Sequence, residues 1–183
     1  MNNEMKSALL VIDVQVGIAR NDGIHAGWPG ILSNIASLIA RSHAAGLPAI
    51  IVQHDGGPGH PLEPGTDGWA LCPELGIADS DLLVRKTACD AFLGTNLESI
   101  LRGRGVQHLM VAGCMTEYCV DTTVRRATSL GFDVILASDA HGTFNSPSLR
   151  AEQIIEHHNN LLDGFAAGGV SVEVKPSTAI SFS

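Results

Sequence analysis

The sequence has few basic residues. It contains 11 lysines and arginines against 19 aspartates and glutamates, which gives a formal net charge of −8 at pH 7. A chain of this charge is repelled at long range by the phosphates of nucleic acid and by anionic membrane surfaces. The composition therefore argues against nucleic acid and membranes as partners.

Long apolar runs are also missing. No stretch approaches the roughly 20 apolar residues that a membrane-spanning helix needs. The first 15 residues hold one lysine and a short apolar run that soon reaches Asp13, so they lack the long apolar core of a signal peptide. We therefore expect a cytoplasmic protein. Its 183 residues, 45% of them hydrophobic, can bury one substantial core, and we expect a single domain over residues 1–183.

The four cysteines form no pattern typical of a structural site. Cys72, Cys89, Cys114 and Cys119 include no CxxC pair and no partnered Cys/His pairs at zinc-finger spacing. In a reducing compartment they are thiols, and a free cysteine is most often a small buried residue. For Cys89 and Cys114 we predict this structural role.

Apolar runs alternate with amphipathic segments along most of the chain. This alternation predicts a three-layer α/β/α domain with a six-stranded, mainly parallel sheet. The strands are nearly continuous in apolar residues, as in a sheet that is covered on both faces. Strands are predicted at residues 8–13, 48–53, 81–86, 108–113, 133–138 and 170–175, and helices at 31–46, 95–102, 116–130 and 148–162.

Three reactive side chains fall near the carboxyl ends of predicted strands. Asp13 closes the first strand, Lys86 closes the third, and Cys119 follows the fourth. In open parallel sheets, functional groups gather at these ends, near the point where the strand order reverses. We expect the three to meet, with the first, third and fourth strands side by side in the order 2-1-3-4-5-6.

The surroundings predicted for Cys119 favour a nucleophile. Thr116 is a candidate N-cap, which places Cys119 in the first turn of a helix. The helix dipole there and the nearby Lys86 both stabilise a thiolate. Asp13 could take the thiol proton and return it to a leaving group if burial makes the carboxylate more basic.

Three segments carry a family resemblance. LLVIDVQ at residues 9–15, KTACDAF at 86–92 and GCMTEYCVDTTVRRATSLGFDVILASDA at 113–140 occur in order and frame most of the chain. Together they resemble the isochorismatase-like cysteine hydrolase superfamily, which includes nicotinamidases, N-carbamoylsarcosine amidohydrolases and related amidases. The resemblance implies a Rossmann-like fold, a catalytic triad of Asp13, Lys86 and Cys119, no cofactor, and a homodimer or homotetramer.

The resemblance also implies how the reaction proceeds. A cis peptide between Cys114 and Met115 would aim the Met115 N–H into the site, where it and the Cys119 N–H form an oxyanion hole. The Cys119 thiolate would attack a small amide, lactam or ureido carbonyl. Water would then hydrolyse the thioester.

The chain departs from two branches of the superfamily. Isochorismatases proper typically lack the nucleophilic cysteine, so Cys119 favours C–N cleavage. Nicotinamidases hold a metal with Asp-x-His and a further His, whereas this chain has His54 and His60 in VQHDGGPGH without that spacing. We expect no metal here and expect His54 to contact substrate, and Trp69, Phe92 and His141 are further candidate substrate contacts.

Two alternatives remain open. One is isochorismatase-type hydrolysis without a covalent intermediate, which would survive loss of the thiol. The other is a thiol redox or ligand-binding protein without turnover, which predicts reversible oxidation of Cys119. Asp13 favours hydrolysis, because a redox sensor has little use for a general base beside its thiol.

Overall fold

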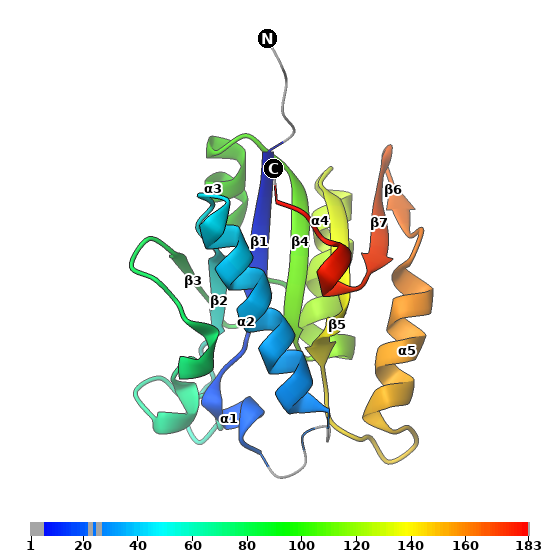
Figure 1. Ribbon diagram of the computed structural model, residues 1–183. Helices are drawn as coiled ribbons and strands as arrows, with labels where there is room; N and C mark the ends of the chain where they lie inside the picture. The colour runs from blue at the N-terminus through cyan, green and yellow to red at the C-terminus, as the bar shows by residue number, and fades with distance from the viewer. Residues whose placement is uncertain (1–5, 22–23, 25–26, 183) are drawn as a thin grey trace.

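The computed structural model describes residues 6–21, 24 and 27–182. Figure 1 shows one sheet with helices on both faces. The strands are β1 (Lys6–Ile12), β2 (Ile50–His54), β3 (Leu82–Lys86), β4 (Val106–Cys114), β5 (Asp133–Gly142), β6 (Ala166–Ala167) and β7 (Val170–Lys175). The α-helices are α1 (Val16–Ala19), α2 (Trp28–Ala44), α3 (Leu97–Gly103), α4 (Asp121–Ser129) and α5 (Ala151–Leu162). Short helical turns are η1 (Asp67–Trp69), η2 (Pro73–Leu75), η3 (Thr116–Val120) and η4 (Ser177–Ala179).

The predicted α/β class with a mainly parallel sheet is confirmed, and the strand order is similar to the predicted one except for the place of β3 and one additional strand. The sheet has seven strands in the order β3-β2-β1-β4-β5-β7-β6, and every pair is parallel except β6 with β7. The additional strand, β6, has two residues, too few to produce an apolar run in the sequence. β3 lies at the edge beside β2, so β2 separates it from β1.

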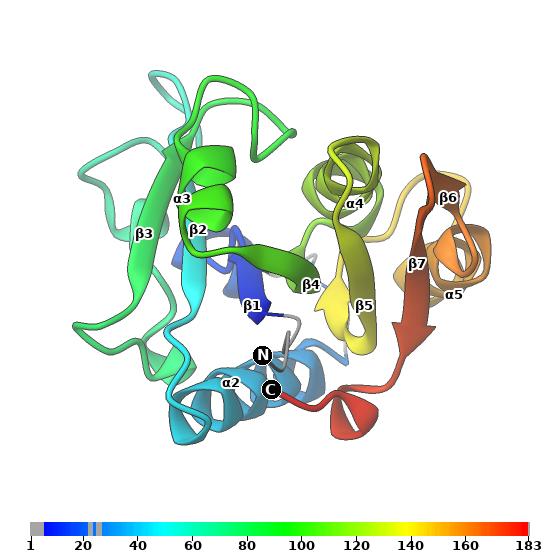
Figure 2. The same ribbon diagram turned by 90° about the horizontal axis from the view of Figure 1, so that it is seen from above.

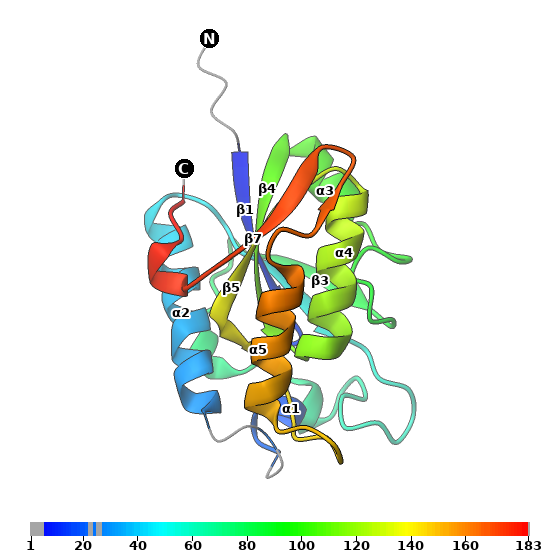
Figure 3. The same cartoon turned by 90° about the vertical axis from the view of Figure 1, so that its right-hand side faces the viewer.

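Alternate residues of each central strand face two separate apolar cores. In β1, Leu10 and Ile12 point to the core formed with α3 and α4, whereas Leu9 and Val11 point to the core formed with α2. Seen from above, α2 lies on one face of the sheet and α3 and α4 lie on the other (Figure 2). The view onto the β7 edge shows the same layers, with α5 beside that edge (Figure 3). Burial on both faces explains the nearly continuous apolar runs of the strands.

The helix predicted at residues 116–130 consists of two parts. It starts as a π-helical turn, η3, in which the Val120 N–H bonds the Met115 carbonyl five residues back at 3.1 Å, and it continues as α4. Met115, in extended conformation, is the N-cap. The prediction of Thr116 as N-cap is therefore wrong, because its hydroxyl pairs with His141 at 2.9 Å instead. No helix within the described residues is both long and apolar enough to cross a membrane.

Candidate active site

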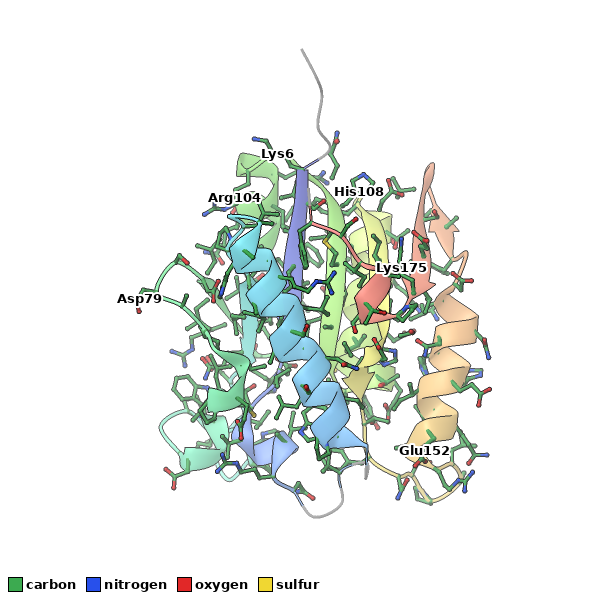
Figure 4. All side chains as sticks on the ribbon, viewed as in Figure 1. Lys6, Asp79, Arg104, His108, Glu152 and Lys175 are labelled. Carbon is green, nitrogen blue, oxygen red and sulfur yellow. The ribbon has the colours of Figure 1, made fainter. Side chains whose placement is uncertain are left out.

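The candidate site lies at the carboxyl ends of the strands. Figure 4 marks the opposite, amino-terminal end of the sheet with Lys6 and His108, and it places Glu152, in the first turn of α5, far from that end. Asp13 directly follows β1, Lys86 is the last residue of β3, and Cys119 lies in η3 after β4. These are the positions that the sequence predicted, and the fold brings all three side chains together.

A glycine lets β1 and β4 approach closely just before the site. Gly113 has a φ of 126°, and a Cβ at this position would overlap the backbone of Ile12. Directly after Ile12, Asp13 adopts a left-handed conformation with a φ of 53°, which is uncommon for a residue with a side chain. The Asp13 N–H bonds the Val52 carbonyl at 2.9 Å, and the Asp13 carbonyl accepts the Cys114 thiol at 3.1 Å. These contacts fix the position of Asp13 between β2 and β4.

Lys86 contacts both of the other predicted catalytic residues. Its Nζ lies 2.6 Å from Asp13 Oδ2 and 3.3 Å from Cys119 Sγ, and its side chain is 0% exposed. Nζ also donates to the Ala88 carbonyl at 2.9 Å and lies 3.2 Å from His54 Nδ1, so its three N–H groups are shared among four neighbouring atoms. In the observed sheet, β3 lies beside β2 and not beside β1. The long side chain of Lys86 crosses the end of β2 to reach Asp13. The three residues therefore meet although β3 does not lie beside β1 as predicted, while the first and fourth strands, β1 and β4, are neighbours.

The pKa values of the three groups depend on their burial and on one another. Burial raises the pKa of Asp13 above its ordinary value, although Lys86 opposes the shift. Burial opposes protonation of Lys86, but the charges of Asp13 and Cys119 outweigh it and raise the pKa of the lysine. Burial and the Asp13 charge raise the pKa of the Cys119 thiol well above its ordinary value. Burial and the Asp13 charge thus oppose the thiolate of Cys119, whereas the Lys86 charge favours it.

One oxygen of Asp13 has no partner. Within the described part of the chain, Asp13 Oδ1 is buried and makes no hydrogen bond, whereas Oδ2 is bound to Lys86. A buried carboxylate oxygen without a partner is costly, because it has lost its hydration without compensation. Oδ1 is thus available to accept a proton. The peptide bond from Cys114 to Met115, on the same side of the sheet, is cis.

A cavity of about 300 Å³ opens beside Asp13 and Cys119. Its size suits a small molecule and not an extended polymer. Its polar lining consists of Asp13, Asn21, His54, His60, Cys89 and Cys119. The remaining described lining residues are Gly17, Ile18, Pro61, Leu62, Met115, Tyr118 and Phe144.

Of the four predicted substrate contacts, only His54 lines this cavity. Trp69 is held outside it, where its indole N–H donates to Asp55 at 2.9 Å and its ring stacks under Arg85. Phe92 is 8% exposed and packs on Phe132 in the core. Neither aromatic side chain therefore lines the cavity, and both pack against other parts of the protein.

His141 does not line this cavity either. It is fully buried, accepts from the Thr116 hydroxyl at 2.9 Å, and contacts Asn159 Oδ1 at 2.9 Å. Because the Asn159 amide N–H₂ donates to the Ser138 carbonyl, its oxygen faces the ring, so His141 Nε2 carries the proton and Nδ1 accepts. His141 therefore positions the start of η3, the turn that contains Cys119.

The sequence analysis missed two features of the site, one in the cavity lining and one behind it. Cys89, predicted to be a buried structural thiol, is exposed and lines the cavity, while Cys114 is buried as predicted. Gln15 is 0% exposed and its amide bonds the backbone of His54 in both directions, at 2.9 and 3.0 Å, and the Trp69 carbonyl at 2.9 Å. Gln15 thus ties β1 to β2 and to the long loop after β2. Its place directly after the buried strand, as a polar residue in an apolar run, was the available signal.

Comparisons with known proteins identify the family of the chain. Residues 7–170 match the isochorismatase domain family. Streptothricin hydrolase of Streptomyces noursei is 37% identical over 141 residues, which cover 77% of this chain and 51% of the relative. The chain therefore spans about half the length of that relative.

Two further matches cover a larger share of the matched protein. Ureidoacrylate amidohydrolase RutB of Rhizobium rhizogenes is 29% identical over 171 residues, which cover 74% of this chain and 70% of the relative. A crystal structure of an isochorismatase family protein superposes with a TM-score of 0.82 and 34% identity, and covers 92% of this chain and 97% of the other. The resemblance seen in the three sequence segments is confirmed, and the chain belongs to the isochorismatase-like hydrolase family.

Proposed function

We propose that the protein is a cysteine-dependent amidohydrolase that cleaves a C–N bond of a small amide, lactam or ureido compound through a thioester. The observation that carries the proposal is the buried Lys86 ammonium, 2.6 Å from Asp13 and 3.3 Å from Cys119, with Asp13 Oδ1 left unpartnered. The names of two relatives support it, because one is a hydrolase of streptothricin and the other an amidohydrolase of ureidoacrylate.

Proton transfer from Cys119 to Asp13 starts the proposed reaction. Each group's ionised form is disfavoured by burial, and the Asp13 charge further disfavours the thiolate. Moving the thiol proton to Asp13 removes this repulsion and leaves one anion beside Lys86. The thiolate then forms as substrate binds, and Lys86 stabilises it.

The thiolate attacks the carbonyl carbon, and the backbone N–H groups of Met115 and Cys119 are the donors assigned to the resulting oxyanion. The C–N bond breaks, and Asp13 returns the proton to the leaving amine or ammonia. Water, deprotonated by the same carboxylate, attacks the thioester and releases the acid and the free thiol.

The test is ammonia release from a panel of small amides, ureido compounds and lactams by wild type and Cys119→Ala. We expect turnover to disappear in Cys119→Ala and to persist in Cys72→Ala, a matched control whose cysteine is buried and lies outside the cavity lining. Wild-type rates in Cys119→Ala would favour non-covalent hydrolysis. Reversible oxidation of Cys119 without any turnover across the panel would favour the redox alternative.

A further inference from the structure

Two histidines of the cavity wall, His54 and His60, each have a partner at Nδ1. His54 ends β2 and His60 lies in the loop that follows, and their ring centroids are 5.7 Å apart. In each ring Nδ1 is already occupied. His54 Nδ1 lies 3.2 Å from Lys86 Nζ, and His60 Nδ1 lies 3.0 Å from the backbone N–H of Leu62.

These contacts fix the tautomer of both rings. An ammonium group and a backbone N–H can only donate, so both Nδ1 atoms accept, and in a neutral imidazole the other nitrogen then carries the proton. The His54 ring is neutral at pH 7, because burial and the Lys86 charge lower its pKa to about 4. Within the described residues no hydrogen bond engages either Nε2. The wall therefore offers two N–H donors whose partner is not part of the described protein.

Contacts with Gly56 and Leu62 hold the His60 ring in position. Gly56 lies against the imidazole, and a Cβ at residue 56 would overlap the ring. The Gly56 N–H bonds the Leu62 carbonyl at 2.8 Å, while the Leu62 N–H bonds the ring. The neighbouring Gly57 has open space around its Cβ position. A side chain is thus excluded at residue 56 but not at residue 57, which provides a matched pair of substitutions.

The charges of the wall restrict what these donors can bind. The described lining contains no lysine or arginine, and it does contain the Asp13 carboxylate. Lys86 lies behind the wall and is already bound to Asp13. A carboxylate of the substrate would lose its hydration here, find no cation and face a like charge. A carbonyl oxygen meets none of these penalties and accepts N–H donors.

We propose that His54 and His60 are specificity-determining residues that recognise a second carbonyl group on an uncharged amide substrate through their Nε2–H groups. This proposal rests on the proposed function and adds a substrate class to it: neutral compounds with two carbonyl groups, in preference to amides that carry a carboxylate. The same tautomers oppose metal binding, because a ligating histidine donates from its second nitrogen, whereas here the second nitrogen accepts.

The tautomers are measured without substrate. Two-bond ¹H–¹⁵N spectra at pH 7, assigned with His54→Gln and His60→Gln, should show in both rings a proton on Nε2 and none on Nδ1. A proton on Nδ1 of either ring, or a charged His54, would overturn the proposal. This result does not depend on catalysis, so it separates the proposal from the proposed function.

Recognition of the second carbonyl group is measured with three primary amides of similar size and shape that differ only in the group at the other end. Succinamide carries a second uncharged amide, 4-methylpentanamide replaces that amide by an isopropyl group, and succinamate replaces it by a carboxylate. We expect kcat/KM for ammonia release to be at least about tenfold higher for succinamide than for the other two, the size of one lost hydrogen bond to a buried donor. Where the wild type cleaves none of them, their dissociation constants for Cys119→Ala give the same comparison. Equal values, or a preference for succinamate, would overturn the proposal.

Variants assign the preference to the histidines. His60→Phe and Gly56→Ala should both reduce the preference for succinamide over 4-methylpentanamide, and His60→Gln, which retains an N–H donor, should restore part of it. Gly57→Ala should keep the wild-type preference. If both His54→Phe and His60→Phe kept the wild-type preference for succinamide, the assignment of this preference to the histidines would be contradicted. The proposed function would still stand in that case if Cys119→Ala lost all turnover.

Discussion

Lys86 Nζ contacts Asp13 Oδ2 at 2.6 Å although a whole strand, β2, lies between the strands that carry them. Neighbouring strands are about 4.8 Å apart, so the lysine spans roughly two strand spacings across the end of β2. His54, at the end of β2, contacts the same ammonium at 3.2 Å. The site is therefore assembled over the ends of four strands and held together by one buried charge.

Removing that charge should destabilise the fold as well as the site. Lys86→Met leaves the buried Asp13 carboxylate without its cation, and we expect the free energy of unfolding in urea to fall by about 3 kcal/mol or more. Asp13→Asn combined with Lys86→Met should recover much of this loss, because no unpaired charge then remains. A single variant as stable as the wild type would contradict the buried ion pair.

Asp13→Asn should have opposite effects on thiol reactivity and on turnover. The Asp13 charge raises the pKa of the Cys119 thiol and Lys86 lowers it, so the asparagine variant should hold more thiolate at pH 7. We expect faster alkylation of Cys119 by iodoacetamide, together with a loss of amide turnover of at least about 10²-fold, because the general base is gone. Slower alkylation in this variant would show that Asp13 does not disfavour the thiolate.

Gly113 should be intolerant of any side chain. A Cβ there would overlap the Ile12 backbone, and the φ of 126° is unfavourable for other residues. We expect Gly113→Ala to lower the free energy of unfolding by about 3 kcal/mol or more. Gly103→Ala, at the end of α3 with open space around its Cβ position, is the control and should match or exceed the wild type. Equal stability of the two variants would contradict the close approach of β1 and β4.

The sequence predicted the reactive residues better than their surroundings. Asp13, Lys86 and Cys119 could be identified because each polar residue ends or follows an apolar run. Only the place of β3 in the sheet was predicted incorrectly. A long lysine side chain can reach Asp13 across β2, so the meeting of the two residues does not require β3 to lie beside β1, and the loop before β3 has no periodicity that would reveal its pairing. Trp69, Phe92 and His141 lie outside the cavity lining, because residue type does not reveal which side of a loop or strand faces the cavity. The position of His60 in the cavity wall could not be predicted either, because it depends on a turn that is defined by the packing of Gly56 and Leu62.

Buried His141 should make the fold sensitive to acid. Burial lowers its pKa from 6.5 to about 4, so the unfolded chain binds more protons than the folded chain between these pH values. The free energy of unfolding should therefore fall as the pH drops from 6.5 towards 4, with a slope approaching about 1.4 kcal/mol per pH unit from this group. His54, whose pKa is lowered in the same direction, contributes in the same window.

Urea unfolding of wild type and His141→Gln at pH 7, 5.5 and 4.5 measures this effect. The glutamine cannot take up a proton, so its variant should lose less stability between pH 7 and 4.5, even if it is less stable at pH 7. Identical pH dependence in the two proteins would show that His141 is not held neutral by burial.

The most direct test of covalent catalysis is the mass of the intact protein after rapid acid quench with an amide that the enzyme turns over. The proposed thioester predicts a species heavier than the free protein by the mass of the substrate minus that of the released ammonia or amine. Peptide mapping should locate the added mass at Cys119, and Cys119→Ala should not acquire it. Steady turnover with no adduct at any quench time, together with wild-type turnover by Cys119→Ala, would contradict a nucleophilic role for Cys119.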